Sequence, residues 1–173
     1  MHRRALAGWM GAALGALTGA VHAQSCHPLD GRWMYVPAES RVGAGLAFSP
    51  HDAISAIDLS IGTSAGQINQ RWAFHGPHID RTAQYELLMD DVRRPTRLES
   101  PKDFEYSAVA AQWQNCTLIV HGYSSLFGLE IATSDTYVVS EDGQRLSILR
   151  YGESPVSITD QRLEFIKQNS AGN

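Results

Sequence analysis

The sequence predicts an all-β protein: a single antiparallel up-and-down barrel or sandwich of about nine or ten strands. Three observations predict this fold class. Apolar–polar alternations of period two recur along the chain, turn residues separate them, and no long helical period occurs after residue 23. With 173 residues, 43% of them hydrophobic, the chain suits one domain with one core.

The first half of the chain alternates clearly in three segments, at residues 32–36, 68–75 and 79–89. In the second and third segments apolar and aromatic side chains share one face and polar side chains the other, which is typical of half-buried strands. In the first segment Trp33 and Tyr35 share one face, and Met34 and Val36 lie on the other. Gly76-Pro77 between the second and third segments indicates a hairpin. Residues 53–61 fit either a helix or a strand, because their aliphatic residues match both periods.

A polar turn is expected at residues 90–95, where two aspartates precede two arginines and a proline. The second half then repeats the pattern of short strands, which we expect at residues 104–113, 116–123, 126–131, 136–140, 145–151 and 161–167. Asp142-Gly143 is the strongest hairpin signal in the chain. All of these strands fall in one uninterrupted domain, residues 24–173.

The amino terminus has the pattern of a secretory signal peptide. Arg3 and Arg4 provide a positive start, residues 5–21 are apolar and uncharged, and Ala23 ends a Val-His-Ala cleavage sequence. We therefore expect residues 1–23 to be removed and the mature protein to be periplasmic or secreted. The alternative is a membrane anchor, but the apolar run is short and rich in glycine and alanine. No later segment predicts a stable membrane span.

Cys26 and Cys116 are the only two cysteines of the chain. An oxidising compartment favours their pairing, and the bridge would close a loop of about ninety residues, worth about 4 kcal/mol in the chain-entropy model. The alternative is a lipid-modified Cys26, which the preceding Ala23-Gln24-Ser25 fits poorly. We expect the disulfide.

Gly31-Arg32-Trp33, at the first expected strand, resembles the G-x-W signature of lipocalins. The run continues to Ser40 through a Pro-Ala-x-Ser sequence, and Ser140-Glu141-Asp142-Gly143 supplies a late Ser-x-Asp-Gly turn. Together these motifs are similar to those of small exported bacterial proteins of unassigned function with a lipocalin-like (calycin-type) layout. The resemblance covers most of residues 24–173 in layout and only these short runs in motif.

The lipocalin resemblance implies an antiparallel barrel in which Trp33 closes one end. In lipocalins an arginine from a late strand stacks across this tryptophan; Arg162 is the best match in this chain, and Arg150 is the second. A cation over a desolvated indole contributes about 1 to 2 kcal/mol. All three residues are therefore expected to be structural.

Composition and motifs argue against several functions. The formal net charge of −4 leaves no basic field for a nucleic-acid backbone. No constellation of catalytic residues is present, so we name no catalytic residue and expect a protein that is not an enzyme. His75 and His78 are the only close histidine pair, whereas a zinc site needs three or four ligands. We expect neither a metal nor a cofactor.

Six aromatic residues at strand spacing are candidates to line an apolar cavity: Tyr35, Trp72, Phe74, Tyr85, Phe104 and Trp113. In a hollow barrel they would form the walls of a site for a small apolar ligand. In a filled barrel the same residues would be core.

The leading hypothesis is therefore an exported lipocalin-like protein that binds a small apolar ligand inside the barrel. A protein-interaction or inhibitor module, with no partner that the sequence identifies, is the second hypothesis, and an enzyme with an unrecognised site is the third. An interior cavity would favour the first hypothesis, and a filled core with an exposed apolar patch would favour the second.

Overall fold

The computed structural model describes residues 28–41, 54–64, 66–98, 105–126, 128–154 and 157–168. Its strands are β1 (Gly31–Tyr35), β2 (Ala56–Ser64), β3 (Gln67–Gly76), β4 (Ile79–Leu88), β5 (Arg94–Pro95), β6 (Ala108–Gln114), β7 (Thr117–Leu126), β8 (Leu129–Val139), β9 (Arg145–Ser154) and β10 (Ser157–Lys167). A short 3-10 helix, η1 (Pro37–Glu39), follows β1.

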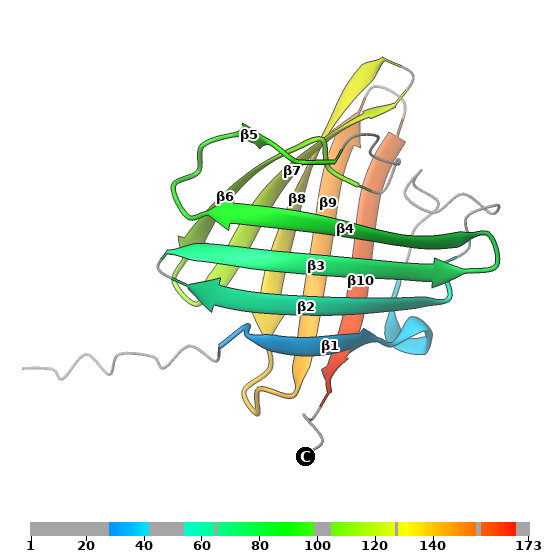
Figure 1. The fold of residues 1–173 in the computed structure, drawn as a ribbon, viewed down its shortest axis with the longest axis vertical. Coiled ribbons are helices and arrows are strands. Elements are labelled where there is room, and N and C mark those ends of the chain that lie inside the picture. The colour runs from blue at the N-terminus through cyan, green and yellow to red at the C-terminus, as the bar shows by residue number, and fades with distance from the viewer. Residues whose placement is uncertain are drawn as a thin grey trace, which may run out of the picture.

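All ten strands belong to one antiparallel sheet in the order β4-β3-β2-β1-β10-β9-β8-β7-β6-β5. Strands that follow one another in the chain are neighbours, except β4 and β5, and β1 also pairs with β10. The sheet is curled: in Figure 1, β1–β4 run across the front and β6–β10 run behind them in the crossing direction. The predicted all-β up-and-down fold is thus confirmed, as a half-barrel that stays open between β4 and β5.

The core lies between the two layers of this curled sheet. Alternation along each long strand directs one face inward, and β4 shows this clearly: Ala83, Tyr85 and Leu87 are buried, whereas Gln84 and Glu86 are exposed. The buried apolar residues of both layers form one cluster. The strand faces assigned from period-two alternation in β3 and β4 are therefore confirmed.

Both expected hairpins are present. The turn between β3 and β4 contains Pro77, and the turn between β8 and β9 contains Asp142-Gly143, with Gly143 at a φ of 70°. The separate strand expected at residues 126–131 is wrong, because β7 ends and β8 begins within that run. Gly128 between them has a φ of 79°, a left-handed conformation that occurs in tight turns and that few residues other than glycine adopt.

The structure settles or changes four other expectations. The ambiguous segment is a strand, β2, whose alternate aliphatic side chains are buried against the core. The expected polar turn at residues 90–95 includes the two-residue strand β5, which pairs with β6. The strand expected at residues 136–140 is the second half of the longer β8, and β6 begins at Ala108 rather than at residue 104.

Candidate functional site

Four of the six aromatic residues expected to line an apolar cavity are buried: Tyr35, Trp72, Phe74 and Tyr85. They pack within the core, where the ring centroid of Phe165 lies 6.1 Å from that of Trp72 and 5.7 Å from that of Tyr35. Trp113, near the end of β6, is 42% exposed. Phe104 lies outside the described residues.

The space that the buried aromatic residues enclose is filled. The interior hollow lined by Trp72, Phe74 and Tyr85 has a volume of about 10 Å³. One water molecule needs about 10–15 Å³ and ligand sites usually measure about 300–1,000 Å³. In this structure the aromatic residues are therefore core rather than the walls of a ligand cavity.

Trp33 is fully buried, and its indole Nε1 donates a hydrogen bond to the carbonyl oxygen of Leu29 at 2.9 Å. The cation over its ring is Lys167, whose Nζ lies 5.1 Å from the ring centroid and which stands opposite Trp33 in the β1–β10 register. The expectation that Arg162 or Arg150 occupies this place is wrong. Arg162 is exposed on the outer face of β10, and Arg150 lies elsewhere in the core.

Arg150 belongs to a buried polar network between β8 and β9. Its Nε and Nη2 donate to the two carboxylate oxygens of Asp135 at 2.7 and 2.8 Å, and the hydroxyl of Tyr106 donates to Asp135 at 2.8 Å. Burial alone would lower the pKa of Arg150, but Asp135 more than offsets this and holds that pKa well above its usual value. Because its charges are paired, this network orders the core rather than offering a free reactive group.

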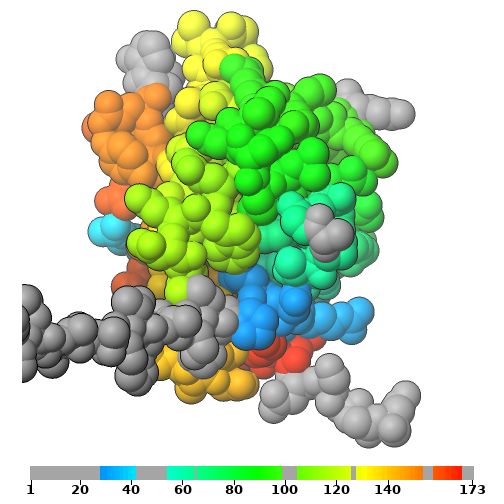
Figure 2. Space-filling view, turned by 90° about the vertical axis from the view of Figure 1, so that its left-hand side faces the viewer, coloured from blue at the N-terminus to red at the C-terminus, as the bar shows by residue number. Residues whose placement is uncertain are grey.

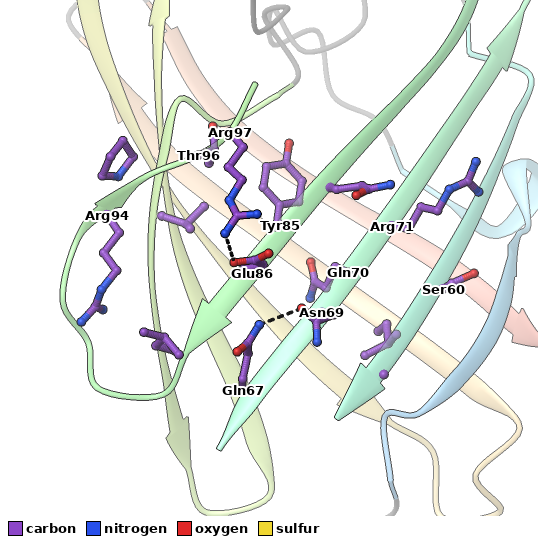
Figure 3. Close-up of a pocket in the computed structure, with 16 residues that line it drawn as sticks. Ser60, Gln67, Asn69, Gln70, Arg71, Tyr85, Glu86, Arg94, Thr96 and Arg97 are labelled. Carbon is purple, nitrogen blue, oxygen red and sulfur yellow. Dashed lines mark hydrogen bonds and ion pairs between the residues drawn. The ribbon is translucent and has the colours of Figure 1, made fainter. Parts of the chain in front are cut away.

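A cleft of about 820 Å³ lies at the open corner between β4 and β5. Figure 2 views the molecule from this side, where the green atoms of β4 and β5 border the teal atoms of β2–β3 and the yellow-green atoms of β6. The close-up in Figure 3 shows one bank formed by β2–β4 and the other by β5 and the residues after it. β5 has only two residues, and Pro95 lacks an N–H group. β5 therefore offers few backbone groups with which β4 could form a hydrogen-bonded ladder.

Charged side chains stand on both banks of the cleft. Arg97 bonds Glu86 across it at 3.0 Å, as the dashed line in Figure 3 shows. Arg94 contacts both carboxylate oxygens of Asp90 at 2.7 Å, and this hydrogen bonding lowers the pKa of Asp90 to about 2. Arg71 has no carboxylate partner among the described residues. The solvent side of the cleft is therefore polar, and on it the Arg71 guanidinium donates a hydrogen bond to the Thr82 hydroxyl at 3.3 Å without an ion pair among the described residues.

The inner wall of the cleft is shared with the core. Gln70, Tyr85 and Val109 border both the cleft and the interior hollow. The Oε1 of Gln70 accepts hydrogen bonds from Trp72 Nε1 at 3.1 Å and from the Tyr137 hydroxyl at 3.3 Å. Burial raises the pKa of Tyr85, so its hydroxyl stays neutral. Tyr85 is thus the one residue among the expected ligand-lining aromatics that reaches this cleft within the described part of the chain.

Gln70 and Arg71 were not among the residues expected from the sequence. A usable signal existed for Gln70, because it interrupts the apolar face of β3 that Ile68, Trp72 and Phe74 continue. A polar side chain at an inward position needs a partner or a function. No local signal marks Arg71, since an arginine at an outward strand position is ordinary.

The two close histidines lie at the end of β3 and in the turn that follows it. His75 Nδ1 lies 3.0 Å from a carboxylate oxygen of Asp80, and His78 is exposed in the turn between β3 and β4. In the part of the chain that the structure describes, no three histidine, cysteine or acidic side chains are grouped as a metal ion requires. None of the described helices could cross a membrane.

Cys116, in the turn between β6 and β7, has no free thiol. Its expected partner, Cys26, and the expected signal peptide, residues 1–23, lie outside the described residues. The pairing of the two cysteines therefore stays a prediction.

The fold and the cleft together define an open ten-stranded antiparallel half-barrel with a filled core. No protein-family model matches the chain, and no curated protein matches it. Among solved structures, a secretary abundant heat soluble (SAHS) protein from Ramazzottius varieornatus is similar, with 13% identity and a TM-score of 0.43 over 81% of this chain and 95% of that chain. At this level the likeness says nothing about function.

Proposed function

We propose that this protein is an exported binding protein for a small amphipathic molecule, and that the molecule binds in the cleft between β4 and β5. The single observation that carries this proposal is the cleft of about 820 Å³, which is within the usual size of ligand sites. Its solvent side is polar, whereas Tyr85 and Val109 at its inner wall offer apolar surface. Such a lining suits a molecule with one polar and one apolar part.

The ligand is placed in the cleft rather than inside the half-barrel because the interior hollow measures only about 10 Å³. A ligand in the core would have to displace well-packed aromatic side chains, and packed interiors resist such changes. The cleft needs no such rearrangement. The binding role expected from the sequence is therefore proposed at the open corner between β4 and β5 rather than in the core.

Export is part of the same proposal. Its support is the amino-terminal signal sequence up to Ala23 and a Cys116 without a free thiol, as expected in an oxidising compartment. N-terminal sequencing of exported protein should find Gln24 as the first residue. An acylated Cys26 at the terminus would show a lipoprotein instead.

The binding role is tested by native mass spectrometry of the exported protein and by titration with prodan, an uncharged fluorescent naphthalene ketone. We expect a retained small molecule or saturable prodan binding. The Gly62→Phe variant should retain no small molecule and should not bind prodan. Gly62 lines the cleft, and no atom lies within 4 Å of the position that a Cβ would take there, so a phenyl ring can occupy the cleft. Ala132→Phe, at an exposed position on the outer face of β8, is the matched control and should bind normally.

Two outcomes contradict the proposed binding role. Wild-type protein that carries no added mass and does not bind prodan would contradict it directly. Equal binding by the wild type and by the folded Gly62→Phe variant would place the ligand elsewhere.

A protein-interaction module is a second candidate, favoured by a separate observation. The core is filled, and the outer face of β8–β10 exposes neighbouring apolar side chains: Val138, Leu149, Tyr151 and Ile158, with Ile158 64% exposed. An exposed apolar group of this kind often marks an interface. Light scattering of the wild type and of the Ile158→Ser variant tests this second candidate. Only if the patch is an interface should the variant lose self-association or a co-purifying partner.

A further inference from the structure

The amide nitrogen of Gln70 is a buried hydrogen-bond donor without a partner. Gln70 is 3% exposed, and its Nε2 has no hydrogen-bonding contact. Buried polar groups are almost always paired, so an orphaned one calls for an explanation. Here the residue stands at the wall between the cleft and the interior hollow.

The orientation of this amide is fixed by its neighbours. Trp72 Nε1 can only donate a hydrogen bond, and it donates to the Oε1 of Gln70 at 3.1 Å. The hydroxyl of Tyr137 donates to the same oxygen at 3.3 Å. Rotating the amide would place an N–H group against the indole N–H, so Nε2 must remain the unused end. Any group that satisfies it must be a hydrogen-bond acceptor.

The acceptor must also be small and uncharged. Of the residues that line the interior hollow beside Gln70, only Arg150 carries a formal charge, and it is committed to Asp135 through two bonds of 2.7 and 2.8 Å. A carboxylate or phosphate placed there would be buried without a free cation, which is strongly unfavourable. The hollow of about 10 Å³ admits little more than one oxygen atom.

We propose that the ligand of the cleft is an amphipathic molecule with an uncharged carbonyl group, and that the oxygen of this group accepts a hydrogen bond from Gln70 Nε2. This inference rests on the proposed function and deepens it. Gln70 is then the residue that selects the ligand's functional group, while Tyr85 and Val109 contact the apolar part beside it.

Three matched probes test the inference: prodan, its analogue with a propyl group in place of the propionyl ketone, and its analogue with a carboxylate there. The wild type should bind prodan about tenfold more tightly than the propyl analogue, the worth of one hydrogen bond. The carboxylate should bind more weakly than prodan. Infrared spectra of prodan with an isotope-labelled carbonyl should show its stretching band at lower wavenumber in the complex than in a dry apolar solvent, where no donor reaches the carbonyl.

Gln70→Met removes the donor and should reduce the preference for the ketone to within about twofold. The matched control is Gln161→Met on β10: Gln161 is also buried with an unpartnered amide, but it does not line the cleft. The control variant should keep the tenfold preference. Should Gln70→Met fail to fold, the infrared band of prodan bound to the wild type decides, and a band at its position in the apolar solvent overturns the inference.

The outcomes separate this inference from the function on which it rests. If ketone and propyl probes bind the wild type equally and Gly62→Phe blocks both, the cleft binds ligands but Gln70 does not select them. A carboxylate that binds more tightly than the ketone would also overturn the inference. If no probe binds and the exported protein carries no added mass, the proposed function fails as well.

Discussion

Replacing Trp33 by alanine should remove a large share of the stability of the half-barrel. Trp33 is fully buried, and a buried tryptophan truncated to alanine costs about 3 to 5 kcal/mol through lost burial and the remaining cavity. The Leu29 carbonyl loses its hydrogen bond, worth about 1 kcal/mol, and Lys167 loses a ring contact worth about 0.5 to 1 kcal/mol. We therefore expect a loss of about 5 kcal/mol, the size of the whole stability of a weakly stable domain.

Urea unfolding followed by far-ultraviolet circular dichroism measures this loss without relying on tryptophan fluorescence. Trp113→Ala is the matched control, since Trp113 is 42% exposed near the end of β6 and its removal should cost about 1 kcal/mol or less. Lys167→Met isolates the ring contact and should cost about 0.5 to 1 kcal/mol. Equal unfolding midpoints for the two tryptophan variants would refute the assignment of Trp33 as a core anchor.

Three further predictions concern the charged and covalent contacts. Arg150→Met should destabilise the protein by about 3 to 5 kcal/mol in urea unfolding, because it leaves Asp135 buried and unpaired, and replacing both residues by apolar ones should recover most of this loss. Arg94→Gln should raise the pKa of Asp90 from about 2 toward 3.8 in a carboxyl NMR titration. Since the folded-state pKa is the lower one, the stability that this pair adds is present above about pH 4 and is lost as the pH falls toward 2. Cys116→Ser should lower stability by about 4 kcal/mol if the predicted bridge exists, and two free thiols in unreduced wild-type protein would contradict the bridge.

The strands whose two faces differ sharply in polarity could be predicted from the sequence. β4 alternates along its ten residues and β3 along part of its length, and Asp142-Gly143 marks the turn between β8 and β9. The β7–β8 hairpin was not predicted, because apolar residues stand on both sides of Gly128 and continue the strand pattern across the turn. Period-two alternation identifies strands, but it does not show where one strand turns into the next when both are apolar.

The site was less predictable because it depends on register between distant strands. Lys167 lies over the ring of Trp33 because the two residues are register partners between β1 and β10. They are more than a hundred residues apart in the chain, so the sequence near either residue does not indicate the pairing. The expectation of Arg162 or Arg150 came from a resemblance whose short motifs do not fix this register. The cleft is equally nonlocal, since it exists only where β4 and β5 fail to meet.

The open corner is held by side chains, and this makes the cleft a built feature rather than a frayed edge. Arg81 bonds the fully buried Glu105 at 2.6 Å, and the N–H group of Tyr106 donates to the hydroxyl of Tyr85 at 3.1 Å. Backbone pairing would have set neighbouring strands about 4.8 Å apart and closed the seam. Side-chain bonds span a greater distance, so they join the two edges while keeping them apart. A chain that needed only a filled core would gain by closing this seam, yet the seam stays open beside Gln70, whose amide nitrogen has no partner.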